Sequence, residues 1–390
     1  MSIFEKILQF NADRDKSLIK LKLSRMNASP FAFFRGTDHL FGEAWAKLAP
    51  PDVGPDGLIC GDLHVENFGA YRTTTGDWRF DVNDFDEALV APCGLDVVRC
   101  ASSILLAAED WQLSPIASAN LVLTFLDHYR KATLHSLKND TIGEIKAGGG
   151  TDLISGALGS TRLETQTKLL DTYTKRSRTG NRAIRRDDLR RPELKESVVE
   201  NVLHALQDYA QTSSTPDAFR GLDVTGRIAG IGSLGVKRYL VLVADDGSGS
   251  GDRLLDIKQA TRSSLLDCSS AEQPDFSGNE AQRTVQAQKH LQGDSAAGLD
   301  SLPIRKKFYR IREMIPDEDR CQIDRFRRKL EQLKEALGII GRVVAWSHLR
   351  GARIDSMDNR VELGKWAAGS ALDAVLKSAV RYADRTINDF

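Results

Sequence analysis

Residues 60–69, CGDLHVENFG, concentrate side chains that can bind metal ions or phosphates. Asp62, His64 and Asn67 lie in this one turn-prone stretch, and the chain continues to NDFDEA, which contains Asp84 and Asp86. Carboxylate and amide oxygens are the ligands that Mg²⁺ prefers in proteins. The composition of these two stretches therefore predicts a metal site, a phosphate site, or both.

Phosphoryl transfer needs such groups, because a carboxylate must orient the attacking hydroxyl while oxygen ligands hold Mg²⁺. Protein kinases use an Asp, an Asn five residues later, and an Asp that follows a hairpin. Asp62 and Asn67 have that spacing, and Asp84 ends a predicted hairpin at 69–82. A turn in which these side chains only cap backbone groups is the alternative. The expected roles are Asp62 as base, His64 contacting a phosphate or positioning Asp62, and Asn67, Asp84 and Asp86 as metal ligands.

A second candidate is the glycine-rich stretch GIGSLG, with Gly230, Gly232 and Gly235. A dinucleotide-binding loop would lead into a helix. Here the run leads into VKRYLVLV, which has the pattern of a strand. A strand, a glycine loop and a second strand form the arrangement that covers phosphates in kinases. Lys258 follows in the strand LLDIKQA and is expected to pair with phosphates, although a surface lysine on an edge strand is the alternative.

The helix predicted at 279–291 offers Glu280 as an acidic partner for Lys258, unless Glu280 only favours the helix N-terminus. Residues 175–191, KRSRTGNRAIRRDDLRR, are rich in arginine and could receive an acidic substrate or form a solvated loop. No aromatic residue interrupts this run, and stacking on aromatic rings is typical of single-stranded nucleic-acid binding. We therefore expect no nucleic-acid partner.

Composition narrows the class of protein further. The chain has 390 residues, with 54 Lys+Arg and 54 Asp+Glu, so bulk charge favours neither nucleic acid nor a membrane. Its 5 cysteines are dispersed without a CxxC pair, which fits a reducing compartment more than a disulfide framework or a zinc site. No apolar run reaches the roughly 18 residues that suggest a membrane helix. We expect a cytoplasmic protein that does not bind membranes.

The elements that must position these residues are α+β in pattern. Helical periodicity is strong up to residue 27, at 96–137, at 322–350 and at 362–387. An aromatic segment broken by proline follows at 29–36, and strands are expected at about 58–86 and 222–315.

The segments ICGDLHVENFG, FDVNDFDEALVAP and LDVVRCASS resemble the aminoglycoside phosphotransferase branch of the protein-kinase-like superfamily. In that branch the residue matching Asp96 is a structural buried acid. Together with SPFAFFRG and GIGSLGVKRYLVLV, they resemble more closely an uncharacterised bacterial family known only as a domain of unknown function. Cys60 departs from the superfamily pattern, in which a histidine often precedes the Gly-Asp pair. The interval from Asn67 to Asp84 is also long, which leaves Asp81 open as a metal ligand.

The resemblance implies a bilobal kinase-like fold, but the order of its parts is inverted, since the catalytic loop precedes the glycine loop. Circular permutation would explain this order, because position in space and not in the chain defines a site. We therefore predict a large helical lobe at 1–220, with a variable Arg-rich insertion or substrate region at 138–220. A nucleotide-binding lobe is predicted at 221–316, and helices that return to the large lobe at 317–390.

The resemblance also implies an ATP- and Mg²⁺-dependent phosphotransferase, with a nucleotide and a small-molecule or protein hydroxyl as partners. Two alternatives remain open. One is a nucleotide-binding, pseudokinase-type regulator without turnover. The other is a metal-dependent phosphoesterase, which also begins with a GDxH motif but needs further histidine ligands.

Overall fold

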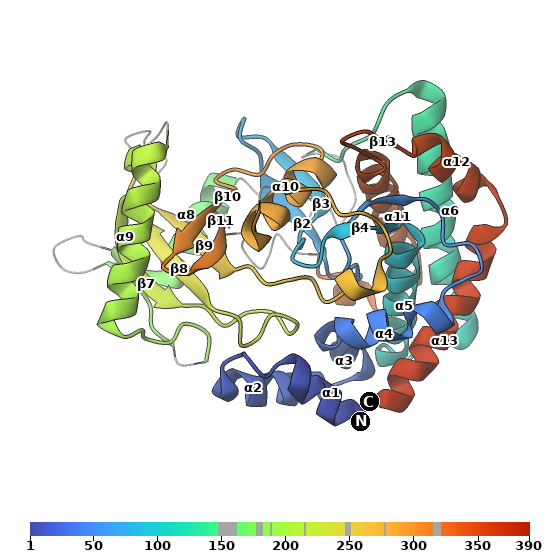
Figure 1. Ribbon diagram of the computed structural model, residues 1–390, viewed down its shortest axis with the longest axis horizontal. Helices are drawn as coiled ribbons and strands as arrows, with labels where there is room; N and C mark the ends of the chain where they lie inside the picture. Colours follow the sequence, from blue (N-terminus) through green and yellow to red (C-terminus); the bar gives the residue numbers. More distant parts are fainter. Residues whose placement is uncertain are drawn as a thin grey trace.

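The computed structural model describes residues 1–146, 162–176, 182–187, 189–213, 216–245, 251–276, 278–314 and 321–390. A part built around the largest sheet lies on the left of Figure 1, and a mainly helical part lies on the right. The two ends of the chain lie beside each other, and the Phe390 ring packs edge-on against Phe33. The mixture of helices and small sheets agrees with the predicted α+β class.

The largest sheet has five antiparallel strands in the order β10-β11-β9-β8-β7. On one face, Val241, Ile257 and Ile311 belong to an apolar cluster that also contains Val202 and Leu206 of helix α9 (Glu196–Thr212). Because side chains alternate between faces, a slip by one residue would expose this cluster, so its burial fixes the register. The strands are β7 (Gly221–Gly226), β8 (Arg238–Val243), β9 (Arg253–Gln259), β10 (Asp300–Ile304) and β11 (Lys307–Glu313).

The other face of this sheet is divided into an apolar and a charged half. Leu240, Leu242 and Leu254 cluster with Leu170 of helix α8 (Arg162–Tyr173) and with Ile184 of strand β6 (Arg182–Ile184), which pairs with β5 (Thr174–Arg176). The charged half faces the cleft described below. Helix α10 (Glu280–Leu291) follows β9 in the chain and contacts β10, β11 and the helical part.

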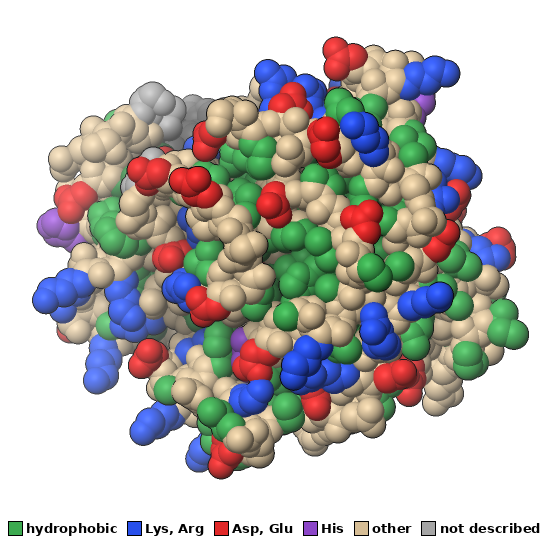
Figure 2. Space-filling model, turned by 45° about the vertical axis from the view of Figure 1, so that its right-hand side comes forward, with side chains coloured by type: hydrophobic (Ala, Val, Ile, Leu, Met, Phe, Trp, Pro, Cys, Tyr) green, Lys and Arg blue, Asp and Glu red, His purple; other side chains and the backbone are tan. Residues whose placement is uncertain are grey.

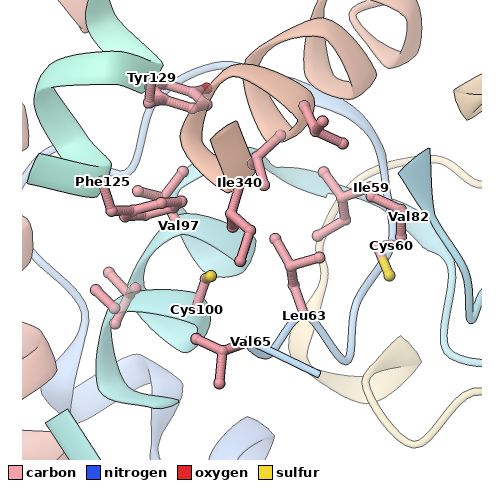
Figure 3. Packing of buried hydrophobic residues seen from close by; sticks show 14 of the residues in the cluster. Ile59, Cys60, Leu63, Val65, Val82, Val97, Cys100, Phe125, Tyr129 and Ile340 are labelled. Carbon is pink, nitrogen blue, oxygen red and sulfur yellow. The ribbon is translucent and has the colours of Figure 1, made fainter. Parts of the chain in front are cut away.

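The helical part is held together by one large apolar cluster. Helix α11 packs along α6, and α13 packs against α5. Figure 3 shows residues of this cluster from several elements meeting in one place, among them Val97, Phe125 and Ile340. The helices are α5 (Gly94–Asp110), α6 (Pro115–Asn139), α11 (Leu330–Gly351), α12 (Arg360–Ala368) and α13 (Ala371–Asp389).

Three short strand pairs and four N-terminal helices complete the description. The hairpin of β2 (Phe68–Arg72) and β3 (Trp78–Val82) occupies the region where one was predicted. Strand β1 (Asp56–Ile59) pairs with β4 (Leu89–Pro92), and β12 (Arg353–Ile354) pairs with β13 (Met357–Asp358). The N-terminal helices are α1 (Ile3–Phe10), α2 (Lys16–Met26), α3 (Pro30–Gly36) and α4 (Asp38–Leu48).

The predictions for three segments need correction. Residues 29–36 are not broken by proline: Pro30 is the first residue of α3, and the Ser29 hydroxyl caps that helix, so the proline starts it. The helix predicted at 322–350 begins later, after a short 3-10 turn (Ile323–Phe326). The helix predicted at 362–387 is two helices, α12 and α13, which are interrupted at Gly369 and Ser370.

Candidate functional site

A cleft of about 1150 Å³, counting its opening to solvent, lies between the five-stranded sheet and the loop that precedes β2. Among the described residues its lining is mostly polar, with Phe10, Ile231 and Val236 as the large apolar side chains. Many of the predicted site residues line it together, namely Asp62, His64, Asn67, Asp84, Asp86, Gly230, Gly232 and Lys258. Asp81 lies outside this lining, beside Arg350.

The loop at 60–67 is anchored by its apolar side chains. Leu63 and Val65 are buried in the core of the helical part, close to Val97 and Cys100 of α5 (Figure 3). Because these residues point into the core, Asp62 on the same loop is directed toward the cleft. Local sequence thus fixes which side chains of the loop are available to a ligand.

A buried acid holds the start of this loop. The Asp96 carboxylate accepts hydrogen bonds from the backbone N–H groups of Cys60 and Gly61, both at 2.9 Å. His348 Nε2 lies 3.3 Å from Asp96, and its Nδ1 lies 2.9 Å from the Tyr129 hydroxyl. The observed contacts of Asp96 therefore match the structural role that the resemblance implied.

Gly61 allows the chain to turn at this point. Its φ is +88°, and a Cβ atom there would lie 2.3 Å from the Glu87 carbonyl oxygen. A side chain at this position would therefore be strained and would collide with backbone. The glycine places Asp62 directly after the two N–H groups that Asp96 binds.

Asp62 is paired with an arginine that sequence reasoning missed. Arg99 of α5 is fully buried, and its Nε lies 2.9 Å from Asp62 Oδ1 and 2.9 Å from Asp38 Oδ1. The guanidinium also lies over the rings of Phe34 and Phe41. A lone arginine within the apolar helical run LDVVRCASSILLAA was the signal that could have found it.

His64 is buried and uncharged. Burial, and then the positive charge of Arg35, lowers the pKa of His64 well below its usual value. Its Nδ1 accepts a hydrogen bond of 3.2 Å from the Glu66 N–H, which leaves the proton on Nε2. Arg35 forms an ion pair of 2.5 Å with Glu66, so this turn is tied to helix α3.

Asn67 connects the loop to the hairpin that carries Asp84. Its side-chain amide donates to the Asp62 carbonyl oxygen, and its own carbonyl accepts from the Asn83 N–H at 2.9 Å. This bond uses the NH₂ group of the Asn67 side chain, and the amide oxygen, which can only accept, has the chemistry of a metal ligand. The backbone bond brings the residue before Asp84 next to the loop of Asp62.

Lys258 lies between the two acids of NDFDEA. Its Nζ is 3.7 Å from Asp84 Oδ2 and forms a closer ion pair with Asp86. Burial alone would raise the pKa of Asp84, but Lys258 and then Arg310 outweigh it and hold that pKa below its usual value. The second oxygen, Asp84 Oδ1, is buried and has no hydrogen-bond partner among the described residues.

These oxygens are of the type that binds divalent cations. A buried carboxylate oxygen without a partner costs free energy unless a ligand satisfies it. Asp84, Asp86 and the Asn67 amide line one cleft and supply the oxygen donors that Mg²⁺ prefers. Within the described ranges, no group of three or more His, Cys, Asp or Glu residues is arranged to hold a metal.

The glycine loop covers this site. Gly232 approaches so closely that a Cβ atom there would lie 3.1 Å from the Arg35 carbonyl oxygen and 4.0 Å from Asp62 Oδ2. Gly230 lines the cleft with a φ of +79°. Gly235 does not line it, and packs instead against Arg14.

The N-terminal helices hold the glycine loop by its carbonyl groups. Arg14 Nη1 donates to Gly232 O at 2.6 Å, Lys22 Nζ donates to the same oxygen at 2.9 Å, and Arg25 donates to Gly230 O at 3.0 Å. Lys22 and Arg14 also line the cleft, and neither was identified from the sequence. Burial, and then the charge of Arg14, lowers the pKa of Lys22 to about 7.

Glu280 lies elsewhere. It begins α10, pairs with Arg283 at 2.6 Å and lines a neighbouring pocket with Phe276 and Phe308. The acids beside Lys258 are Asp84 and Asp86. The Arg-rich run at 175–191 lies partly outside the described residues; of those described, Arg182 pairs with Asp171 at 3.0 Å.

Figure 2 shows Lys and Arg side chains interspersed with Asp and Glu over one face of the molecule. In the described part of the chain, no helix combines the length and the apolar character required to span a membrane. No curated protein and no solved structure matches the chain. A family model described as "Uncharacterized protein conserved in bacteria (DUF2252)" matches residues 14–390, and the chain therefore belongs to that bacterial family.

Proposed function

We propose that this chain is an ATP- and Mg²⁺-dependent phosphotransferase with a circularly permuted, kinase-like fold. The observation that carries this proposal is that the loop of Asp62, the stretch NDFDEA, the glycine loop and Lys258 all line one cleft. Lys258 Nζ lies 3.7 Å from Asp84 Oδ2, and Gly232 lies beside Asp62, although these residues come from distant parts of the chain. Unrelated motifs have no physical reason to converge in this way.

The permutation is supported by the position of α11. Its last residue, Gly351, packs against strand β1 so closely that a Cβ atom would lie 1.9 Å from the Leu58 carbonyl oxygen. Helix α11 follows the sheet in the chain, and β1 leads into the loop of Asp62. A chain passing from the sheet through α11 into this loop would have the order of parts found in kinases.

Each residue then has a physical task. Asp62, held by Arg99, orients the acceptor hydroxyl and takes up its proton. Lys258 and the glycine loop bind the phosphates. Mg²⁺, held by Asn67, Asp84 and Asp86, would neutralise charge on the phosphate oxygens. Catalysis would consist mainly of positioning and charge stabilisation, as in phosphoryl transfer generally.

The test compares Asp62→Asn and Asp84→Asn with the native chain in an assay of ADP formation from ATP and Mg²⁺. We expect Asp62→Asn to lose about 100-fold or more of the activity, the range for loss of a general base. Asp84→Asn should also lose activity, because it removes a proposed ligand of Mg²⁺. Asp77→Asn, in the exposed turn of the same hairpin, is the matched control. Circular dichroism and thermal unfolding establish that all three variants are folded. Full ADP formation by the folded Asp62 and Asp84 variants would reject the proposal.

One observation favours a second candidate, a nucleotide-binding regulator without turnover. Asp62 Oδ1 is engaged by the buried Arg99, so one of its two carboxylate oxygens is already occupied by a fixed partner. A regulator would bind ATP in a Mg²⁺-dependent manner and form no ADP. The phosphoesterase alternative lacks such support, because among the described residues no second histidine joins His64 in the lining of the cleft.

A further inference from the structure

The charged half of the five-stranded sheet forms a buried basic surface at the back of the cleft. It consists of Arg238, Lys258, Arg310 and Arg312, around a single acid, Asp256. The strand register places them side by side: Lys258 is opposite both Arg238 and Arg310, and Arg312 is opposite Asp256. All four cations line the cleft.

Asp256 neutralises only part of the positive charge of this surface. It binds Arg238 through two bonds of 2.6 Å and Arg227 at 2.9 Å, and it lies 3.5 Å from Arg310. One carboxylate cannot neutralise three guanidinium groups. Asp84 and Asp86 lie beside Lys258, and Asp84 is also close enough to Arg310 and Arg312 for their charges to lower its pKa. Neither acid forms an ion pair with these two arginines within the described residues.

Two arginines therefore keep unused donors. Arg310 is 1% exposed, and its Nε and Nη1 have no hydrogen-bond partner among the described residues. Arg312 is 6% exposed, and its Nε is likewise without one, although its Nη1 donates to Asn83 at 3.1 Å. Buried N–H donors without partners are costly, so these donors favour the binding of an anion.

The chemistry of the surface favours phosphate over a nucleobase. Guanidinium groups bind phosphate oxygens through paired N–H donors, whereas a purine ring needs apolar walls. The apolar half of this sheet face, with Leu240 and Leu242, is already covered by Leu170 and Ile184. The half that faces the cleft is ionic.

We propose that this basic surface binds the polyphosphate chain of the donor, and that phosphates rather than the base supply most of its affinity. The inference deepens the proposed function and rests on it. Its ligand class is a chain of three or more phosphoryl groups, either as a nucleoside triphosphate or as inorganic tripolyphosphate. The distances between cations on three adjacent strands suit an extended anion better than a single phosphate, because strands lie about 4.8 Å apart.

The test measures binding by the full-length chain with Mg²⁺, using calorimetry and thermal unfolding. The ligands are ATP, inorganic tripolyphosphate, adenosine and inorganic phosphate. We expect tripolyphosphate to bind within about tenfold of ATP, to raise the unfolding temperature, and to compete with ATP. Adenosine and inorganic phosphate should bind at least about 100-fold more weakly than ATP, because each lacks the chain of phosphates.

Three variants distinguish binding at this basic surface from nonspecific attraction between the protein's positive charges and an anion. Arg312→Gln leaves the Asp256 network intact and should weaken tripolyphosphate at least about tenfold, as expected for a lost charge-assisted contact. Arg310→Gln should do the same. Arg305→Gln, in the exposed turn between β10 and β11, should bind as the native chain does.

Several results would overturn the inference. It would be overturned if adenosine competed as well as ATP, or if tripolyphosphate did not bind. It would also be overturned if inorganic phosphate bound as tightly as tripolyphosphate, or if both arginine variants were folded and bound tripolyphosphate with unchanged affinity. None of these readouts requires turnover. Full activity of Asp62→Asn would reject the proposed transfer while leaving tripolyphosphate binding as it stands. If tripolyphosphate did not bind but Asp62→Asn lost its activity, only this inference would be rejected, and the proposed function would stand.

Discussion

Lys22 is a buried cation whose charge depends on pH near neutrality. It comes from α2, is 1% exposed, and donates to Gly232 O and to Asn11 Oδ1. Burial is the main reason that its pKa falls from the ordinary value of 10.5 to about 7, and the nearby acids, Asp62 among them, only partly oppose this. An anion bound in the cleft would favour the protonated form.

This shift predicts a pH dependence of stability. Between about pH 7 and 10 the unfolded chain keeps the Lys22 proton while the folded chain has lost it, so stability gains up to about 1.4 kcal/mol per pH unit from this residue. Below about pH 7 both states are protonated and the full cost of burying the charge remains. Lys22→Met removes this dependence.

Urea unfolding of the native chain and of Lys22→Met across pH 6–10 measures this pH dependence of stability. The native free energy of unfolding should rise relative to that of the variant as the pH increases. Lys20→Met, on the exposed side of the same helix, should follow the native curve. Parallel curves for the native chain and Lys22→Met would contradict the shifted pKa.

The sequence allowed some of these residues to be found because their signals are local. Asp62, Asn67 and Asp84 are recognisable by spacing, and Lys258 by the apolar residues around it. Arg310 and Arg312 alternate with Tyr309 and Ile311, a pattern that ordinarily indicates a solvent-facing side of a strand. Only the tertiary structure turns that side into the wall of a cleft.

At the level of elements, the contact between α11 and β1 determines where the loop of Asp62 begins. Gly351 is the closest point, because nothing larger than hydrogen fits against the Leu58 carbonyl group. Helix α11 also carries His348, which lies beside Asp96. The helix thus supports the loop both by packing and through a polar contact.

Gly351→Ala should therefore destabilise the protein by about 1–3 kcal/mol, since a Cβ atom at 1.9 Å from backbone forces the helix and strand apart. Gly369→Ala is the control, because the nearest atom to its Cβ would lie at 3.4 Å. Chemical denaturation of both variants measures the effect. Equal stability of Gly351→Ala and the native chain would show that the helix docks differently.

The sequence predicted the presence of these elements better than their boundaries. Strong apolar periodicity revealed α11, and the glycine run between strand patterns indicated the sheet. The single helix predicted at 362–387 was wrong because the apolar spacing continues across Gly369, while the backbone does not. The packing of Gly351 on Leu58 depends on residues far apart in the chain, and no local pattern encodes it.

For the whole molecule, the neighbouring positions of the two chain ends suggest that the order of the parts is not essential to the fold (Figure 1). The contacts between α13 and α5, and between α11 and α6, require that these helices lie side by side, whatever their order in the chain. Joining neighbouring ends with a flexible linker introduces little strain, and exposed loops tolerate new ends.

We therefore expect a rearranged chain to fold. In it, residue 390 is joined to residue 1 by a Gly/Ser linker and the chain is opened between residues 213 and 216. The five-stranded sheet then comes first, followed by α11 and later by the loop of Asp62. Its circular dichroism, its unfolding temperature and its ATP binding should match those of the native chain.

A second rearranged chain, opened after Ala345 within the buried middle of α11, is the control and should fail to fold. A linear chain that carries the same linker at its end tests the effect of the linker itself. If this linear chain were soluble and folded while the first rearranged chain misfolded, the permutation would be contradicted.

The link between Asp96 and His348 has a consequence for synthesis of the protein. The loop of Asp62 is made before helix α11, which carries His348 and supports this loop. Contacts so distant in sequence form only when both partners are present. The loop therefore cannot gain its native support until α11 has left the ribosome.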